Sequence, residues 1–75
     1  MKRIAVLGAG SWGTALALVL ARNGHTISLW GRNADVMTDM REHRINARYL
    51  PDHALPATIT PTADLTVAVK NCDVV

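Results

Sequence analysis

The stretch that most constrains the fold runs from Ile4 to Ala21, IAVLGAGSWGTALALVLA. Its first four residues are apolar and rich in β-formers, a pattern typical of a strand buried on both faces of a parallel sheet. Three glycines follow in the spacing GxGxxG, and a helical apolar pattern comes after them. The order of strand, glycine turn and helix predicts the start of a βαβ unit.

Each glycine of this turn has its own physical role. Gly8 permits the tight turn out of the strand, Gly10 lets the backbone approach a pyrophosphate, and Gly13 removes the side chain where helix and strand touch. The unpaired N–H groups at the helix start point to the same place and stabilise an anion there. Because the motif stands between a strand and a helix, we favour a dinucleotide site over a purely conformational glycine turn.

The next elements complete the unit. A helix is predicted from Ser11 to Asn23, and Gly24 provides a left-handed stop for it. Residues 26–30, TISLW, are β-branched and aromatic and predict the second strand. The residues of the helix that are expected to pack on the sheet are Ala15, Leu16, Leu18, Val19 and Leu20.

The residues after the second predicted strand indicate which dinucleotide is favoured. An NAD-selective site has an Asp or Glu there, about 20 residues past the glycines, to accept the ribose hydroxyls. This chain has Gly31, Arg32 and Asn33 instead. Because Arg32 can bond a 2′-phosphate bidentately and stack on adenine, we favour NADP over NAD, with a solvated loop arginine as the alternative. Asp35 is expected in the first turn of the next helix, where its charge suits the helix dipole.

That next helix is predicted over residues 34–44, with Asn33 as its cap. Its apolar face is expected to hold Val36, Met37 and Met40. Residues 45–56 form a connection with two prolines and no clear period. A connection of this length in a small unit is more often functional than filler.

A third strand and a third helix are predicted after the connection. The strand covers residues 57–60 and ends at Pro61, and Thr62 is expected to cap a helix over residues 63–70. The residues of this helix expected to point inward are Leu65, Ala68 and Val69.

The end of the sequence, Val74 and Val75, resembles the start of a fourth strand. We expect the second and third strands on one side of the first, and the strand that the residues from Asp73 begin on the other. The predicted fold is α/β, a Rossmann-type parallel sheet forming the N-terminal half of a doubly wound domain, truncated at the fourth strand. Residues 1–75 are then a partial NAD(P)-binding Rossmann domain, with the C-terminal substrate domain outside the sequence.

Composition and spacing argue against several other classes of protein. A formal net charge of +2 gives no reason to expect a nucleic-acid partner. Cys72 is the one cysteine, which excludes an internal disulfide and a cysteine metal cluster and favours a reducing, cytoplasmic setting. Asp39 and His43 are four residues apart, a spacing at which both could bind one metal ion. Because no third ligand accompanies them, they are interpreted as surface residues, and no metal is expected.

An apolar run after Lys2 and Arg3 resembles a signal peptide or a short membrane span. The three glycines, Ser11 and Thr14 interrupt the run where a signal is most continuous, so no membrane association is expected.

Three arginines would share one side of the second helix if it continued, namely Arg41, Arg44 and Arg48. Because no aromatic residues interleave with them, they are interpreted as a solvated face rather than a nucleic-acid surface. His25 and His53 lie in predicted turns and are interpreted as structural or exposed.

Four segments carry a resemblance to a known family: GAGSWGTALA, LWGRN, NARYLPDHALP and the terminal NCDVV. In this order they resemble the N-terminal part of bacterial NAD(P)-dependent glycerol-3-phosphate dehydrogenase, over all 75 residues but only about the first quarter of such an enzyme. The pattern of Asn46, Tyr49, Leu50 and Pro51 is more specific than the glycine motif. The resemblance implies reversible reduction of dihydroxyacetone phosphate to sn-glycerol 3-phosphate, which feeds phospholipid synthesis in the cytoplasm.

The resemblance also implies a set of cofactor-binding residues. Besides Gly8, Gly10 and Gly13, the set holds Ser11, Trp12, Arg32 and Tyr49. A serine can donate to a pyrophosphate, and Trp12 can wall the nicotinamide side. The alternatives are simple packing for Trp12 and a cover over the sheet edge for Tyr49.

No catalytic residue is assigned. Hydride transfer belongs to the cofactor, while the protein must orient it and supply a proton donor near the carbonyl. In the family a lysine further along and a helical C-terminal domain provide these. Lys2 precedes the first strand, at the end opposite the glycine turn, and Lys70 closes a helix, so neither replaces that lysine. Residues 1–75 alone are therefore expected to lack dehydrogenase activity.

Other functions stay open at this point. The glycine turn and Arg32 equally suit a module that binds NADP(H) without turnover, or a related reductase acting on a keto acid or a sugar nucleotide. A structural alternative is a half-domain whose open sheet edge self-associates. For the parent enzyme the expected partner is a small phosphate substrate, and a homodimer is left open.

Overall fold

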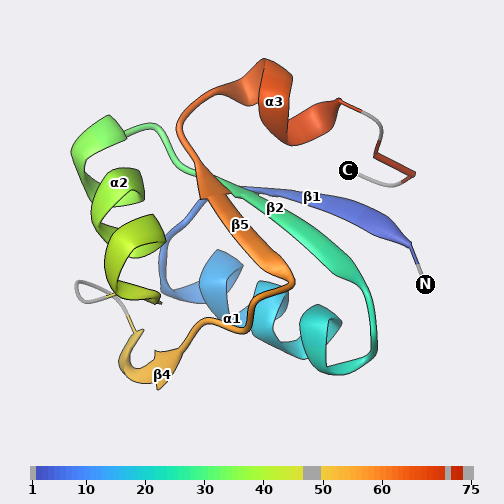
Figure 1. Cartoon of the computed structure of the whole chain (residues 1–75), viewed down its shortest axis with the longest axis horizontal. Helices are drawn as coiled ribbons and strands as arrows, with labels where there is room; N and C mark the ends of the chain where they lie inside the picture. Colours follow the sequence, from blue (N-terminus) through green and yellow to red (C-terminus); the bar gives the residue numbers. More distant parts are fainter. Residues whose placement is uncertain (1, 47–49, 71, 74–75) are drawn as a thin grey trace.

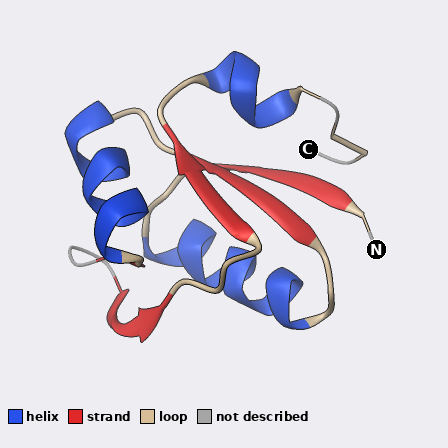
Figure 2. Ribbon diagram, in the orientation of Figure 1, coloured by secondary structure: helices blue, strands red, loops and turns tan. Residues whose placement is uncertain are grey.

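The computed structural model describes residues 2–46, 50–70 and 72–73. Strands and helices alternate along most of this length, as Figures 1 and 2 show. The strands are β1 (Arg3–Leu7), β2 (Thr26–Trp30), β3 (Ile45–Asn46), β4 (Leu50–Ala54) and β5 (Ile59–Thr62). The helices are α1 (Ser11–Arg22), α2 (Ala34–His43) and α3 (Leu65–Val69).

The centre of the fold is a parallel sheet in the order β1-β2-β5. Val6 lies opposite Leu29, and Leu29 lies opposite Pro61. In the view of Figure 1, α1 lies below this sheet and α3 above it, and α2 packs beside β5. Helices on both faces of a parallel sheet confirm the predicted α/β, Rossmann-type fold.

The core lies around β2, the middle strand. Ile27 and Leu29 are fully buried there, because residues two apart point to the same face of a strand. Ile59 of β5 and Met37 and Met40 of α2 belong to the same apolar cluster. The predicted apolar face of α2 is confirmed, and Asn33 caps this helix as expected.

The glycine turn joins β1 to α1 as the spacing predicts. Gly8 has φ of 124°, in the region that favours glycine, and Gly24 has φ of 88° after α1. A Cβ built on Gly13 would overlap the carbonyl oxygen of Gly8. The roles predicted for Gly8 and Gly13 in the turn and in the close helix–strand contact are confirmed.

The predicted inward face of α1 is partly wrong. Leu16 is 40% exposed and Val19 is 52% exposed, whereas Thr14, Ala17 and Leu18 are buried. The buried positions share one face because residues three and four apart neighbour each other on a helix. Small residues occupy most of this face since α1 approaches β1 closely at the glycine turn.

The first strand is also less buried than predicted. Ala5 and Val6 are buried, but Leu7 is 46% exposed and Ile4 is only half-buried. Beside β1, Asp73 donates its backbone N–H to the carbonyl oxygen of Arg3 at 2.8 Å, and its Oδ2 accepts from the Arg3 N–H at 3.0 Å. Segment 72–73 therefore lies on the side of β1 away from β2, as expected, while Val74 and Val75 lie outside the described residues.

The connection over residues 45–56 is not the featureless loop that was predicted. It contains the antiparallel pair β3 and β4, in which Ile45 lies opposite Ala54. Arg44 adopts a left-handed conformation with φ of 59° that ends α2, so the helix does not continue as a shared face for Arg41, Arg44 and Arg48 would require, and Arg48 lies outside the described residues. Arg44 Nη2 donates to the carbonyl oxygens of Pro56 (2.6 Å) and Ile59 (2.5 Å) and so ties the base of the pair to β5.

The third strand is displaced from its predicted place. Pro61 was expected to end it but lies inside β5 and is buried. An edge strand tolerates proline, because the missing N–H faces away from the neighbouring strand. Thr62 was expected to cap the following helix, but it still belongs to β5, and Asp64 Oδ1 caps α3 by accepting from the N–H groups of Thr66 and Val67.

The inward face predicted for α3 is also partly wrong. Ala68 is fully buried, but Leu65 is 45% exposed and Val69 is 37% exposed. The helix is only five residues long and begins later than predicted, so the side-chain directions are shifted.

The contact at Gly13 gives a test of the fold. We expect Gly13→Ala to lower the free energy of unfolding by about 2–4 kcal/mol, because the added methyl group overlaps the backbone of Gly8. Gly10→Ala is the matched control, since a Cβ there meets no atom within 4 Å. Urea unfolding followed by circular dichroism measures both, and equal losses for the two variants would contradict the close contact.

Candidate functional site

A hollow of about 420 Å³ opens at the carboxyl ends of β1 and β2. The carboxyl ends of parallel strands are where open α/β sheets bind ligands. Three short segments line it: the glycine turn, the end of β2 and the first turns of α2. The lining residues are Gly8, Ala9, Gly10, Trp30, Gly31, Arg32, Asn33, Val36 and Met37.

The glycine-turn wall of the hollow is suited to an anion. Gly10 is the N-cap of α1, and the first turn of this helix holds no acidic residue. The N–H groups of that first turn and the positive end of the helix dipole therefore favour negative charge. A Cβ on Gly10 would meet no atom within 4 Å, so the backbone there is open to a ligand.

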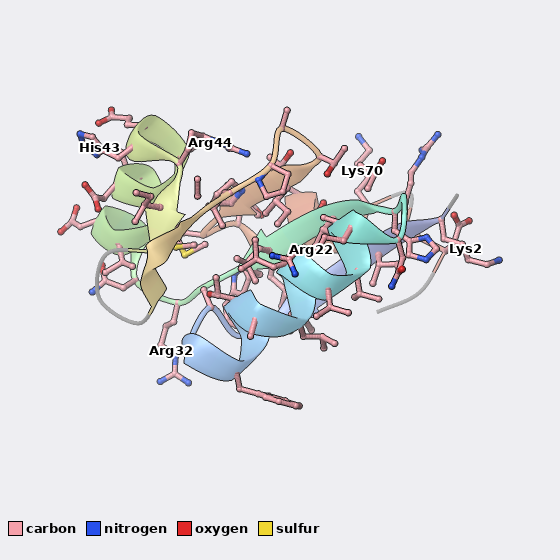
Figure 3. All side chains as sticks on the ribbon, turned by 90° about the horizontal axis from the view of Figure 1, so that it is seen from below. Lys2, Arg22, Arg32, His43, Arg44 and Lys70 are labelled. Carbon is pink, nitrogen blue, oxygen red and sulfur yellow. The ribbon has the colours of Figure 1, made fainter. Side chains whose placement is uncertain are left out.

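The opposite wall, at the end of β2, holds Arg32 and no acidic residue among the described residues that line the hollow. Arg32 is exposed, extends from the chain beside the start of α1 in Figure 3, and takes part in no salt bridge within the described ranges. Asp35 lies in the first turn of α2, as predicted, and is exposed. Asn33 Oδ1 holds this turn by accepting from the N–H groups of Asp35 (3.0 Å) and Val36 (3.2 Å).

Gly31 lines the hollow and carries a packing constraint that was not predicted from the sequence. A Cβ on Gly31 would overlap Met37 Sδ and would lie 3.0 Å from Ala9 Cβ. Its N–H donates to the carbonyl oxygen of Thr62 at 3.1 Å, which fixes the strand end. The available signal was a glycine placed directly after a strand of β-branched and aromatic residues.

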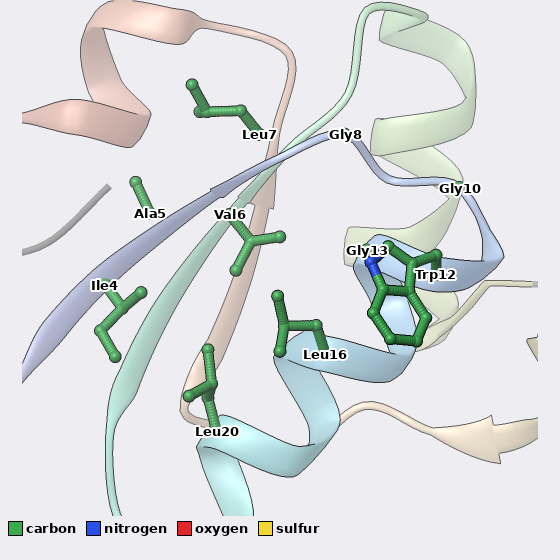
Figure 4. A pocket seen from close by; sticks show the side chains of 10 residues that line it. All are labelled: Ile4, Ala5, Val6, Leu7, Gly8, Gly10, Trp12, Gly13, Leu16 and Leu20. Atoms are coloured by element: carbon green, nitrogen blue, oxygen red, sulfur yellow. The ribbon is translucent and has the colours of Figure 1, made fainter.

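A second, apolar groove of about 810 Å³ lies between β1 and α1. Figure 4 shows its lining, in which Ile4, Val6, Leu16 and Leu20 face one another and Trp12 lies at the end near the glycine turn. Trp12 is 80% exposed, so within the described structure it is not a packed core residue. Gly8 and Gly10 of the glycine turn line both this groove and the hollow that contains Arg32.

Two predicted site residues, Ser11 and Tyr49, lie partly or wholly outside the described structure. Ser11 begins α1, directly after Gly10, but its side chain lies outside the described part of the structure. Tyr49 lies outside the described residues altogether. Their roles in cofactor binding stay predictions.

Metal-binding groups do not gather in the described ranges. No three of their His, Cys, Asp and Glu residues lie together in a way that could hold a metal ion. His43 Nδ1 lies 2.8 Å from Asp39 Oδ1, and both side chains are at least half exposed, which matches a surface pair. His25 Nδ1 accepts from the Lys2 N–H at 3.1 Å and so has a structural role. Among the helices described, none is long and apolar enough to cross a membrane.

Comparison with known proteins adds independent findings. A family model described as the N-terminus of NAD-dependent glycerol-3-phosphate dehydrogenase matches residues 3–75. A glycerol-3-phosphate dehydrogenase (NAD(P)+) of Thioalkalivibrio sulfidiphilus is 57% identical over 67 residues, covering 89% of this chain. The corresponding protein of Halorhodospira halophila is 54% identical over 70 residues, covering 93% of the chain. This chain spans only 20% and 21% of the lengths of these two relatives.

Solved structures agree with these relatives. The crystal structure of glycerol-3-phosphate dehydrogenase from Coxiella burnetii superposes with a TM-score of 0.91 at 45% identity, covering 95% of this chain and 22% of that one. The glycerol-3-phosphate dehydrogenase of Saccharomyces cerevisiae superposes with a TM-score of 0.84 at 26% identity, covering 97% of this chain and 25% of that one.

The cap beside Arg32 gives a test of the site geometry. We expect Asn33→Ala to lower the free energy of unfolding by about 1 kcal/mol, because two N–H groups of α2 lose their acceptor. Asn23→Ala is the matched control, since Asn23 is exposed and its side chain makes no hydrogen bond to the described residues. A loss at Asn33 no larger than that at Asn23, measured by urea unfolding, would contradict the cap.

Proposed function

Because the chain belongs to the family of NAD-dependent glycerol-3-phosphate dehydrogenases, whose N-terminal region it matches, we propose that it binds NADP(H) for the reduction of dihydroxyacetone phosphate to sn-glycerol 3-phosphate. The observation that carries the proposal is the hollow at the glycine turn, which combines an open helix N-terminus with an arginine at the end of β2. The phosphate substrate, a cytoplasmic location and a role in phospholipid synthesis belong to the same proposal.

The proposed placement of the nucleotide follows from the charges and the space. The pyrophosphate lies on the N–H groups at the start of α1, beside Gly10, where no side chain blocks it. The adenosine half lies in the hollow next to Arg32, and the nicotinamide half extends toward Trp12 and the apolar groove. Ser11 and Tyr49 are proposed as further contacts.

Arg32 is the proposed reason for a preference for NADP(H) over NAD(H). A guanidinium bonds a 2′-phosphate through several N–H groups at once, and the exposed Arg32 is free of salt bridges to the described residues. A ribose without the phosphate needs a carboxylate acceptor, and none of the described residues that line the hollow is acidic.

The bound cofactor supplies the hydride in this proposal. The residues of this chain hold and orient the nucleotide, and none of them is assigned as the proton donor for the substrate carbonyl. In this placement the apolar side chains of the groove, among them Val6 and Leu16, would contact the nicotinamide half.

The cofactor preference gives the test of the proposed function. Titration of the chain with NADPH and NADH, followed by tryptophan fluorescence, should find NADPH bound more tightly. We expect Arg32→Ala to weaken NADPH binding by about tenfold and to change NADH binding by less than about twofold, because one charge-assisted contact is lost.

Arg22→Ala is the matched control for this titration. Arg22 is also an exposed arginine, but it lies in the last turn of α1, away from the hollow (Figure 3). Its removal should leave both affinities unchanged. Equal losses of NADPH binding in the two variants, or a folded chain that binds neither nucleotide, would contradict the proposal.

A further inference from the structure

At Gly31, just after the end of β2, the neighbouring residues leave little space for a side chain. This residue is the first after β2, in the short segment where an NAD-selective site has the carboxylate that accepts the ribose hydroxyls. A Cβ on Gly31 would overlap Met37 Sδ and would lie 3.0 Å from Ala9 Cβ. The first atom of an acidic side chain therefore has no space at this position.

Both neighbours are buried. Met37 is 1% exposed and belongs to the central apolar cluster, so its thioether is confined by packing. Ala9 is 9% exposed and lies inside the glycine turn, so displacing it would shift the backbone proposed to hold the pyrophosphate. Gly31 itself is held to β5 by its hydrogen bond to Thr62.

We propose that Met37 is a specificity-determining residue of the nucleotide site, which acts by filling the space beside Gly31. Its side chain occupies the space that a carboxylate side chain at position 31 would need. Arg32 is the one charged side chain among the described residues lining the hollow. This inference rests on the proposed NADP(H) site. It adds a steric determinant, carried by an uncharged residue of α2, to the electrostatic preference of Arg32.

The proposal has a direct consequence for engineering the cofactor preference. Gly31→Asp alone should not create an NAD-selective site, because the new side chain pushes on Met37 and on the glycine turn. The same substitution should succeed once Met37 is shortened. Met37→Val removes Sδ, the atom that a Cβ on Gly31 would overlap.

The packing part of the proposal is tested by a double-mutant cycle. We expect Gly31→Ala to lower the midpoint of thermal unfolding by about 5–15 °C, as overpacking does in a small domain. In the Met37→Val background the loss should fall to less than half. Met40→Val is the matched control background. Met40 is an equally buried methionine of α2, but none of its atoms is among the three nearest to a Cβ built on Gly31. In the Met40→Val background the loss from Gly31→Ala should stay unchanged.

The selectivity part is tested by titrating NADPH and NADH into the same backgrounds. Gly31→Asp with Met37→Val should favour NADH over NADPH, whereas Gly31→Asp with Met40→Val should bind both nucleotides at least tenfold more weakly than the unchanged chain.

Three outcomes would overturn the inference. The first is a stable Gly31→Asp chain that already favours NADH without a change at Met37. The second is a loss from Gly31→Ala that Met37→Val and Met40→Val relieve equally. The third is an unchanged chain that binds neither nucleotide. This result contradicts the proposed function and, with it, the role of Met37 in nucleotide selectivity. The unfolding measurements would still decide whether Met37 fills the space beside Gly31.

Discussion

The rest of the structure depends on the contact between α1 and the glycine turn. A Cβ on Gly13 would overlap the Gly8 carbonyl oxygen, so only a glycine allows the helix to begin this close to β1. The close approach turns the small residues Thr14 and Ala17 toward the sheet, where both are fully buried. The same approach places the first N–H groups of α1 near the end of β1, where the pyrophosphate is proposed to bind.

Hydrogen bonds between the strand ends then fix the shape of the hollow proposed to bind the nucleotide. The Gly8 N–H donates to the Trp30 carbonyl oxygen at 2.8 Å, and the Gly31 N–H donates to that of Thr62 at 3.1 Å. Trp30 Nε1 also donates to the carbonyl oxygen of Ala63 at 3.0 Å. The turns after all three parallel strands are thereby held together. The proposed preference of Arg32 for a 2′-phosphate depends on these fixed strand ends. A mobile strand end would accept a ribose with or without the 2′-phosphate.

Local patterns predicted the features that local physics decides. The glycine turn, the two strands beside it and the Asn33 cap could be predicted, because each depends on neighbours within a few residues. The exposure of Leu16 and the place of Pro61 within β5 could not, since they follow from how closely α1 packs and from which strand forms the edge. The constraint on Gly31 was missed for the same reason, as it comes from a methionine on another element.

The most direct test of the central claim is a map of backbone amide chemical shifts in the isotope-labelled chain as NADPH is added. We predict that the largest changes occur at Gly8, Gly10 and Arg32, with smaller changes along α1. A folded chain whose shifts change elsewhere, for example only around α3, would contradict the claim that the glycine turn and the end of β2 form the nucleotide site.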